Sequence, residues 1–196
     1  MAAQTMTMKS TGQTRIVIAF TVIALLVGWG VKSFVEGQTR PVTQGGISAE
    51  VPSGWQVDTD ESGPLSGGSQ STGLVFTARD PLAPETRYLV SSLPGSPEGD
   101  LATTAAIRNL QRAQSQTAYR VLEQTPVTLE GRAGYRVTFA YVDAGRIDQV
   151  PVVYEGVEYY FAEGDRTIVV TLETTLALEE AIDGFRDFAS EVGLGE

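Results

Sequence analysis

The chain has 196 residues, with 14 Lys and Arg, 24 Asp and Glu, and neither cysteine nor histidine. This length allows one membrane segment and one domain with a real hydrophobic core. The missing Cys and His exclude disulfides, thiolate catalysis, Cys/His zinc sites and imidazole acid–base chemistry. Beyond Arg40 there are 10 basic and 23 acidic residues, a balance of −13. Such an acidic region makes nucleic acid and anionic lipid headgroups poor partners.

An apolar stretch runs from Ile16 to Val35 and carries no charge before Lys32. As an α-helix it is roughly 30 Å long, which matches the hydrocarbon thickness of a bilayer. It has no polar face at helical spacing, so we predict one transmembrane helix over residues 16–35. The apolar side chains expected to anchor this helix in lipid are Ile16, Phe20, Ile23, Leu25, Leu26, Trp29 and Val31.

Two glycines, Gly28 and Gly30, lie near the end of this stretch. They are candidate contacts for a second membrane helix, although glycine is also tolerated in membrane helices without such a role. Basic residues flank the stretch about equally on both sides. The predicted orientation, with the N-terminus inside, therefore rests on the leading role of the first helix and on the acidic domain that follows.

Two other interpretations of the apolar stretch compete with an anchor. A cleaved signal peptide has a shorter apolar region that ends at an A-x-A-like site, and the sites available here fit poorly. A pilin-type subunit needs a glutamate four or five residues after a processing glycine, and Gly12 is followed by Gln-Thr-Arg-Ile-Val. We therefore expect a short tail over residues 1–15, the membrane helix, a linker over 36–45 and a folded domain over 46–196.

Alternation of apolar and polar residues predicts several strands in this domain. The first contains Ile47, Ala49 and Val51 and ends at Pro52. Trp55 follows and is expected to pack on the core rather than to bind a ligand. Further strands are predicted over residues 74–78, 88–91, 120–127, 135–141, 150–161 and 168–172. The strand over 150–161 is interrupted near Gly156 and is either one bent strand or two.

Two helices complete the domain. The first is expected to start after Asp100 as N-cap and to run for about 17 residues. Its apolar side is assigned to Leu101, Ala105 or Ala106, Leu110 and Ala113, and its solvated side to Arg108, Gln111, Arg112 and Gln114. The second starts near Leu176 and has apolar residues at helical spacing up to Val192. The order of strands, helix, strands and helix predicts an α+β fold, a mainly antiparallel sheet covered by helices.

Four segments resemble the PsbP-like family, which includes an extrinsic photosystem II subunit, a Ran-binding import factor and bacterial exported proteins. Ile47 to Trp55 is similar to the opening strand of that family and its turn, in which Pro52, Gly54 and Trp55 mark the fold. The other similar segments are Gly131 to Val137, Gly164 to Val170 and Phe185 to Phe188. The resemblance covers about Gly46 to Leu194 and implies a PsbP-like sandwich with a binding or assembly role. The chain lacks the lipobox cysteine of the bacterial lipoproteins, so a membrane helix would replace the lipid.

Residue types in the domain give no support to an enzyme. Serine has no His or Lys partner there, because the only lysines flank the apolar stretch, and no G-x-S-x-G motif is present. Carboxylate pairs always occur by chance among 23 acids, and Glu155, Glu158 and Glu163 are expected on a solvated face. We therefore expect no catalytic residues, no cofactor and no metal site.

Two functions remain after these exclusions. The first is an accessory or structural subunit of a membrane protein complex, anchored in the plasma membrane of a bacterium with its domain outside the cytoplasm. Its partners would be the lipid bilayer and other subunits of the complex, and not nucleic acid. The alternative is an anchored binding module for a small ligand or an envelope polymer, which would need an open cleft between the sheet and its helices.

Overall fold

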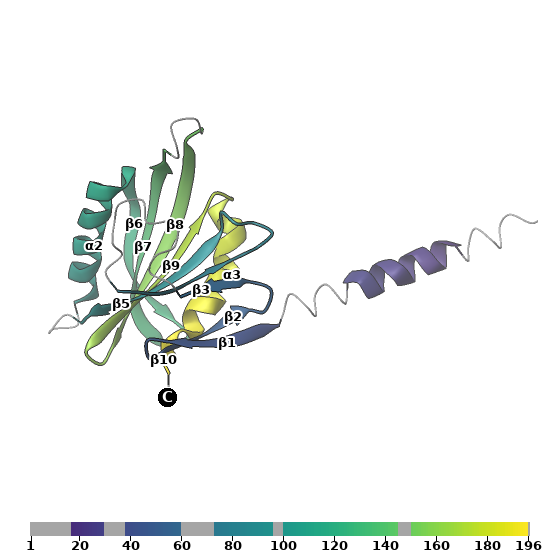
Figure 1. The fold of residues 1–196 in the computed structure, drawn as a ribbon, viewed down its shortest axis with the longest axis horizontal. Coiled ribbons are helices and arrows are strands. Elements are labelled where there is room, and N and C mark those ends of the chain that lie inside the picture. Colours follow the sequence, from purple (N-terminus) through teal and green to yellow (C-terminus); the bar gives the residue numbers. More distant parts are fainter. Residues whose placement is uncertain (1–16, 30–37, 60–72, 96–99, 145–149, 196) are drawn as a thin grey trace, which may run out of the picture. The chain divides into compact units, whose positions relative to one another are not determined.

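The computed structural model describes residues 17–29, 38–59, 73–95, 100–144 and 150–195. Contacts divide the chain into two units, Met1–Thr39 and Arg40–Glu196. An α-helix over residues 17–29 is the described secondary structure of the first unit, apart from the first residue of a strand. The second unit, called the head domain below, consists of two β-sheets and two helices (Figure 1).

The helix over residues 17–29 is roughly 20 Å long at 1.5 Å per residue. Among the described residues, no helix is both long enough and apolar enough to cross a bilayer. The structure therefore does not show the transmembrane span expected over residues 16–35. Ile16 and Val31 of the expected anchor lie outside the described residues.

The main sheet of the head domain has seven strands in the order β3-β4-β5-β9-β8-β7-β6, and neighbouring strands are antiparallel throughout. Its strands are β3 (Gln56–Asp58), β4 (Leu74–Arg79), β5 (Arg87–Pro94), β6 (Thr117–Leu129), β7 (Arg132–Asp143), β8 (Val152–Glu163) and β9 (Arg166–Thr174). This arrangement confirms the predicted antiparallel sheet and adds β3, which the sequence pattern did not indicate.

β8 is one continuous strand, which decides between the two alternatives left open by the sequence. Gly156 lies in its middle, where a Cβ atom would be 2.4 Å from the Phe139 ring and 2.6 Å from the Leu172 carbonyl oxygen. The glycine is therefore not a strand break. It makes room for Phe139, its partner across the β7–β8 ladder.

A second, three-stranded sheet has the order β1-β2-β10. Its strands are β1 (Thr39–Gln44), β2 (Ile47–Pro52) and β10 (Gly193–Leu194). β1 occupies most of the linker expected over residues 36–45, so the folded part begins earlier than predicted. The cause is the turn at Gly45 and Gly46, which have φ of +58° and +78°. Two positive φ values are what a tight hairpin turn requires.

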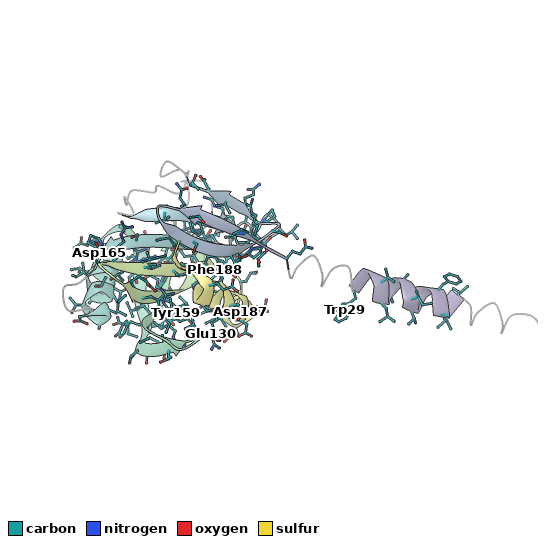
Figure 2. The ribbon with its side chains drawn as sticks, turned by 90° about the horizontal axis from the view of Figure 1, so that it is seen from below. Trp29, Glu130, Tyr159, Asp165, Asp187 and Phe188 are labelled. Carbon is teal, nitrogen blue, oxygen red and sulfur yellow. The ribbon has the colours of Figure 1, made fainter. Side chains whose placement is uncertain are left out.

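The two helices cover opposite faces of the main sheet (Figure 1). α3 (Leu178–Glu191) buries Phe185, Phe188 and Ala189 against β2 and the central strands, as its spacing predicted. Tyr159 of β8 and Phe188 of α3, both labelled in Figure 2, belong to this core. α2 (Leu101–Ser115) packs on the other face, where Ala105 contacts a smaller cluster that includes Val137, Tyr160 and Val169.

α2 begins after Asp100, as predicted, and the Asp100 side chain accepts hydrogen bonds from the amides of Ala102 and Thr103. The assignment of its faces was confirmed for Leu101 and Ala105, which pack inward, and for Gln111 and Gln114, which are exposed, but it was wrong for the arginines and for Leu110. The side chains of Arg108 and Arg112, expected in solvent, are only 12% exposed. Leu110, expected in the core, is 62% exposed. The helix turns its arginines inward because two glutamates lie on the sheet beneath it.

Candidate functional site: an ion network beneath α2

Two glutamates point from the central strands of the main sheet toward α2. Glu158 of β8 pairs with Thr171 of β9, and Glu173 lies two residues further along β9, on the same face. The Glu158 side chain is completely buried and that of Glu173 is 4% exposed. Glu158 was expected on a solvated face, and the structure overturns that expectation.

Arginines from α2 neutralise both glutamates. Arg108 and Arg112 are four residues apart and so lie on one side of the helix. Arg108 Nε is 3.0 Å from Glu158 Oε1, and Arg112 Nη2 is 2.6 Å from the same oxygen. Arg112 Nη1 is 3.1 Å from Glu173 Oε1, so this single guanidinium bridges the two carboxylates.

Arg87 of β5 supplies the third cation of the network. Its Nη2 is 2.5 Å from Glu173 Oε2, and its Nε donates a hydrogen bond of 2.8 Å to the same oxygen. The Tyr141 hydroxyl donates to Glu173 Oε2 at 3.1 Å. The Tyr160 hydroxyl donates to Glu158 Oε2, and Thr171 Oγ1 donates to Glu158 Oε1 at 3.1 Å. Every carboxylate oxygen of the pair therefore has at least one donor.

Aromatic rings contact the arginines of the ion network. The guanidinium carbon of Arg112 lies 4.4 Å from the centroid of the Phe139 ring, and that of Arg87 lies 5.5 Å from the Tyr154 ring. Phe139 also stacks on Tyr119, whose hydroxyl donates to Asn109 Oδ1 of α2 at 2.6 Å. These side chains lie between α2 and the sheet.

The network holds its carboxylates ionised. Burial by itself raises the pKa of Glu158, but the charges of Arg112 and Arg108 and the hydrogen bonds from Tyr160 and Arg108 outweigh it and lower the pKa to about 2. The pKa of Glu173 is also lowered, because Arg87 and Arg112 outweigh its burial. Burial and the Glu158 charge raise the pKa of Tyr160 well above its ordinary value. None of these three groups changes protonation near neutral pH.

This chemistry suits a structural clamp. A glycosidase-type acid needs a carboxyl group whose pKa is raised, and both of these are lowered. A metal needs free oxygen ligands, and these oxygens are occupied by guanidinium and hydroxyl donors. Among the described residues there is no group of three or more His, Cys, Asp or Glu arranged to hold a metal ion. The network fastens α2 to the sheet.

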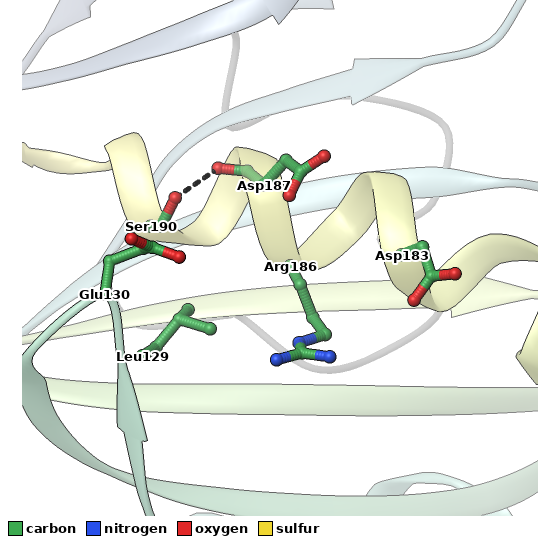
Figure 3. A pocket seen from close by; sticks show the side chains of 6 residues that line it. All are labelled: Leu129, Glu130, Asp183, Arg186, Asp187 and Ser190. Atoms are coloured by element: carbon green, nitrogen blue, oxygen red, sulfur yellow. Dashed lines mark hydrogen bonds between the residues drawn. The ribbon is translucent and has the colours of Figure 1, made fainter.

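Two pockets lie away from the network. One of about 240 Å³ lies between the β6–β7 turn and α3, with Leu129, Glu130, Asp183, Arg186, Asp187 and Ser190 around it (Figure 3). Ser190 Oγ there donates to the Asp187 carbonyl at 2.7 Å, within the helix itself. The other, of about 320 Å³, lies beside the Gly45–Gly46 turn and Arg166. Both are open and lined largely by charged side chains or glycine backbone.

The residues expected to mark the fold have a structural role. Pro52 ends β2, and its carbonyl accepts a hydrogen bond of 2.9 Å from the Trp55 amide across the turn that contains Gly54. The Trp55 ring lies 4.4 Å from the ring of Tyr88, at the margin of the core on the α3 side. Trp55 thus packs on the core, as the sequence suggested.

The expected anchor residues that the structure describes lie on one helix. Phe20, Ile23, Leu25, Leu26 and Trp29 are all exposed, and Figure 2 shows Trp29 near the end of the helix. A Cβ atom at Gly28 would meet nothing within 4 Å. Gly30 lies outside the described residues.

The ion network was not predicted, although the sequence contains a signal for it. Glu158 lies in the run Val157 to Phe161, whose other residues are all apolar or aromatic. These residues fall on both faces of the strand, as in a strand that is buried on both sides. A charge in such a strand requires a partner. The pair Arg108 and Arg112, at helical spacing, was the available counterpart.

No protein-family model and no curated protein matches the chain. Among solved structures, it is similar to cyanobacterial PsbP (CyanoP) from Synechocystis sp. PCC 6803, with a TM-score of 0.56 and 12% identity over 80% of this chain and 92% of that one. The Ran-binding protein Mog1p of Saccharomyces cerevisiae gives 0.46 and 16%, over 80% and 95% of the two chains. LpqN of Mycobacterium tuberculosis, involved in cell envelope biogenesis, gives 0.43 and 15%, over 81% and 91%.

At such low identity these likenesses concern the fold and carry no function across. The likeness to the cyanobacterial protein covers nearly all of that chain, and it agrees with the antiparallel sheet and the helices described above. The resemblance expected from the Pro52-Ser53-Gly54-Trp55 turn is thereby confirmed. The head domain has the PsbP-like fold.

Proposed function

We propose that this chain is a non-enzymatic accessory or structural subunit of a membrane protein complex, tethered to the membrane by its N-terminal apolar stretch. The observation that carries the proposal is the helix over residues 17–29. Its large apolar side chains, from Val17 to Trp29, are exposed around the helix. A helix that is apolar on all sides requires an apolar environment. The hydroxyl of Thr21 donates to the Val17 carbonyl at 3.0 Å, so it is satisfied within the helix, as lipid demands.

The sequence on either side supports the same proposal. Ile16 precedes the described helix, and Val31, Phe34 and Val35 follow it, so that the apolar stretch reaches the roughly 20 residues that a membrane span requires. We place the N-terminus inside and the head domain outside the cytoplasm of a bacterium. The acidic head domain, which has no lysine, agrees with that orientation.

The alternative function needs an open cleft between the sheet and its helices. Among the described residues, the ion network lies between α2 and the sheet, and the aromatic core of α3 lies against the opposite face. Small-molecule sites are concave and mostly apolar with a few polar groups. The two pockets described above are open, and they are lined mainly by charged side chains and by glycine backbone. The alternative function, an anchored module for a small ligand or envelope polymer, gains no support from them.

The proposal is tested by purifying the full chain from its own membranes in mild detergent. We expect other membrane proteins to co-purify in fixed ratio. The matched control is a chain without residues 17–29, which should no longer sediment with washed membranes. A full chain that migrates as a lone species, with no partner in any mild detergent, would contradict the subunit role. A deleted chain that still sediments with washed membranes would contradict the tether alone.

A further inference from the structure

The outer face of α2 has an unusual character for this domain. We define it by the exposed residues Thr103, Ala106, Ile107, Leu110 and Gln114. Ile107 is 56% exposed and Leu110 is 62% exposed, whereas the arginines of the same helix are turned inward. The helix therefore presents two large apolar side chains, Ile107 and Leu110, to the outside, while Leu101 and both arginines face the sheet. An exposed apolar pair opposite inward-facing charges is the reverse of what a helix at a solvated surface usually shows.

The distribution of acidic residues also distinguishes the outer face of α2 from the rest of the domain. Beyond Arg40 the sequence carries 23 acidic residues, yet none lies between Leu101 and Leu122. The exposed side of α2 consists of Ala, Thr, Ile, Leu, Gln and Ser. Two copies of a domain with a balance of −13 repel each other when acidic faces meet, and like charges brought together across an interface cost several kcal/mol. The outer face of α2 permits close approach without that cost.

The position of the apolar pair suits contact with an identical face. Ile107 and Leu110 stand on either side of residue 108, the midpoint of α2. In an antiparallel pair related by a two-fold axis, each Ile107 would meet the Leu110 of the other copy. The small side chain of Ala106 allows the helices to approach, and antiparallel helix dipoles attract. We propose that the head domain self-associates as a two-fold dimer through the outer face of α2.

This proposal does not rest on the membrane tether, because Ile107 and Leu110 both belong to the head domain. A contact through the N-terminal helix would also produce a dimer, and substitution on α2 separates the two. Leu110→Glu adds a charge at an exposed position and leaves the buried network intact. Val153→Glu is the matched control, since Val153 of β8 is 58% exposed and lies outside α2.

The experiment measures the mass of the full chain in mild detergent over a range of concentrations, by light scattering with the detergent subtracted. We expect a concentration-dependent dimer, an at least tenfold weaker dimer for Leu110→Glu and an unchanged dimer for Val153→Glu, with equal circular dichroism for all three. A wild-type monomer throughout would overturn the proposal. So would a dimer that Leu110→Glu leaves intact, which would assign the contact to another surface.

Cross-linking then tests the antiparallel geometry, because the chain has no native cysteine. Along an antiparallel helix pair centred between Ile107 and Leu110, the two Leu110 positions are offset by about 5 Å and the two Gln114 positions by about 16 Å. We expect Leu110→Cys to form a disulfide-linked dimer readily and Gln114→Cys to form little. Equal cross-linking at both positions would indicate a parallel pair and overturn the antiparallel arrangement. Protection of Leu110→Cys in native membranes but not after purification would assign the face to a different subunit.

Discussion

Arg112 of α2 places Nη2 2.6 Å from Oε1 of Glu158, a carboxylate with no exposure to solvent. The negative charge buried at this point of the head domain is compensated by the positive charge of the guanidinium, which lies within hydrogen-bond distance. The same guanidinium reaches Glu173 on the neighbouring strand and covers the Phe139 ring. One side chain thus joins α2 to β7, β8 and β9, and this explains why the arginines of α2 lie inside.

Replacing Arg112 by methionine should destabilise the protein strongly. The substitution keeps much of the side-chain volume but leaves Glu158 and Glu173 with one arginine each. Breaking a buried ion pair costs roughly 3–5 kcal/mol, and we expect the lower part of that range because Arg108 and Arg87 remain. Urea unfolding of the full chain in mild detergent, followed by the circular dichroism of the sheet, measures the change.

Arg120→Met is the matched control for this substitution, because Arg120 is an exposed arginine of β6. A surface change of this kind should stay within about 0.5 kcal/mol. Equal stability of the two variants would show that the buried network adds nothing to the free energy of unfolding.

The free energy of unfolding of the head domain should decrease at low pH, because Glu158 becomes protonated. Its pKa in the folded protein is about 2, against an ordinary value of 4.5. A lowered pKa means that the unfolded chain binds the proton first, so the contribution is complete above about pH 4.5 and is lost as the pH falls toward 2. The contribution is roughly 3 kcal/mol.

Urea midpoints at pH 6, 4 and 3 check this prediction, with Glu158→Gln for comparison. The variant should be less stable at pH 6 and should lose less stability on acidification. Parallel pH profiles for wild type and variant would be incompatible with a lowered Glu158 pKa.

Gly156→Ala should destabilise β8 and its neighbours. The new methyl group would lie 2.4 Å from the Phe139 ring and 2.6 Å from the Leu172 carbonyl oxygen, so the ring or the backbone must move. Overpacking of this kind typically costs 1–3 kcal/mol. Thermal unfolding gives the comparison with Gly193→Ala, where a Cβ atom meets nothing within 4 Å. Similar melting temperatures for both variants would argue against the close contact between Gly156 and Phe139.

Much of the fold could be predicted from local patterns. Alternation identified the longer strands, and the spacing of Phe185, Phe188 and Ala189 identified the buried face of α3. The N-cap at Asp100 followed from its side-chain chemistry. These features depend on residues close in sequence, which is why periodicity and capping rules detect them.

The faces of α2 could not be predicted in the same way. Periodicity assigns charged residues to solvent, whereas Arg108 and Arg112 are held inside by Glu158 and Glu173, some 50 to 60 residues away in sequence. The ion network depends on strand register, which one sequence does not reveal. β1 was not predicted for a different reason, because two adjacent glycines, here at 45 and 46, fit a flexible linker as well as a hairpin turn.

The central proposal is that residues 16–35 hold the chain in a membrane. The most direct measurement is extraction of cell membranes that contain the full chain, first with high salt and then with alkaline carbonate, together with the intact mass of the protein. We predict that the chain stays in the membrane pellet at its full mass. Leu25→Arg with Leu26→Arg should release it, since each charge in the bilayer centre costs about 2.5–3.5 kcal/mol, while Leu82→Arg on the head domain should not. Release of the wild type by salt alone, or a mature chain that begins near Gln38, would contradict the tether.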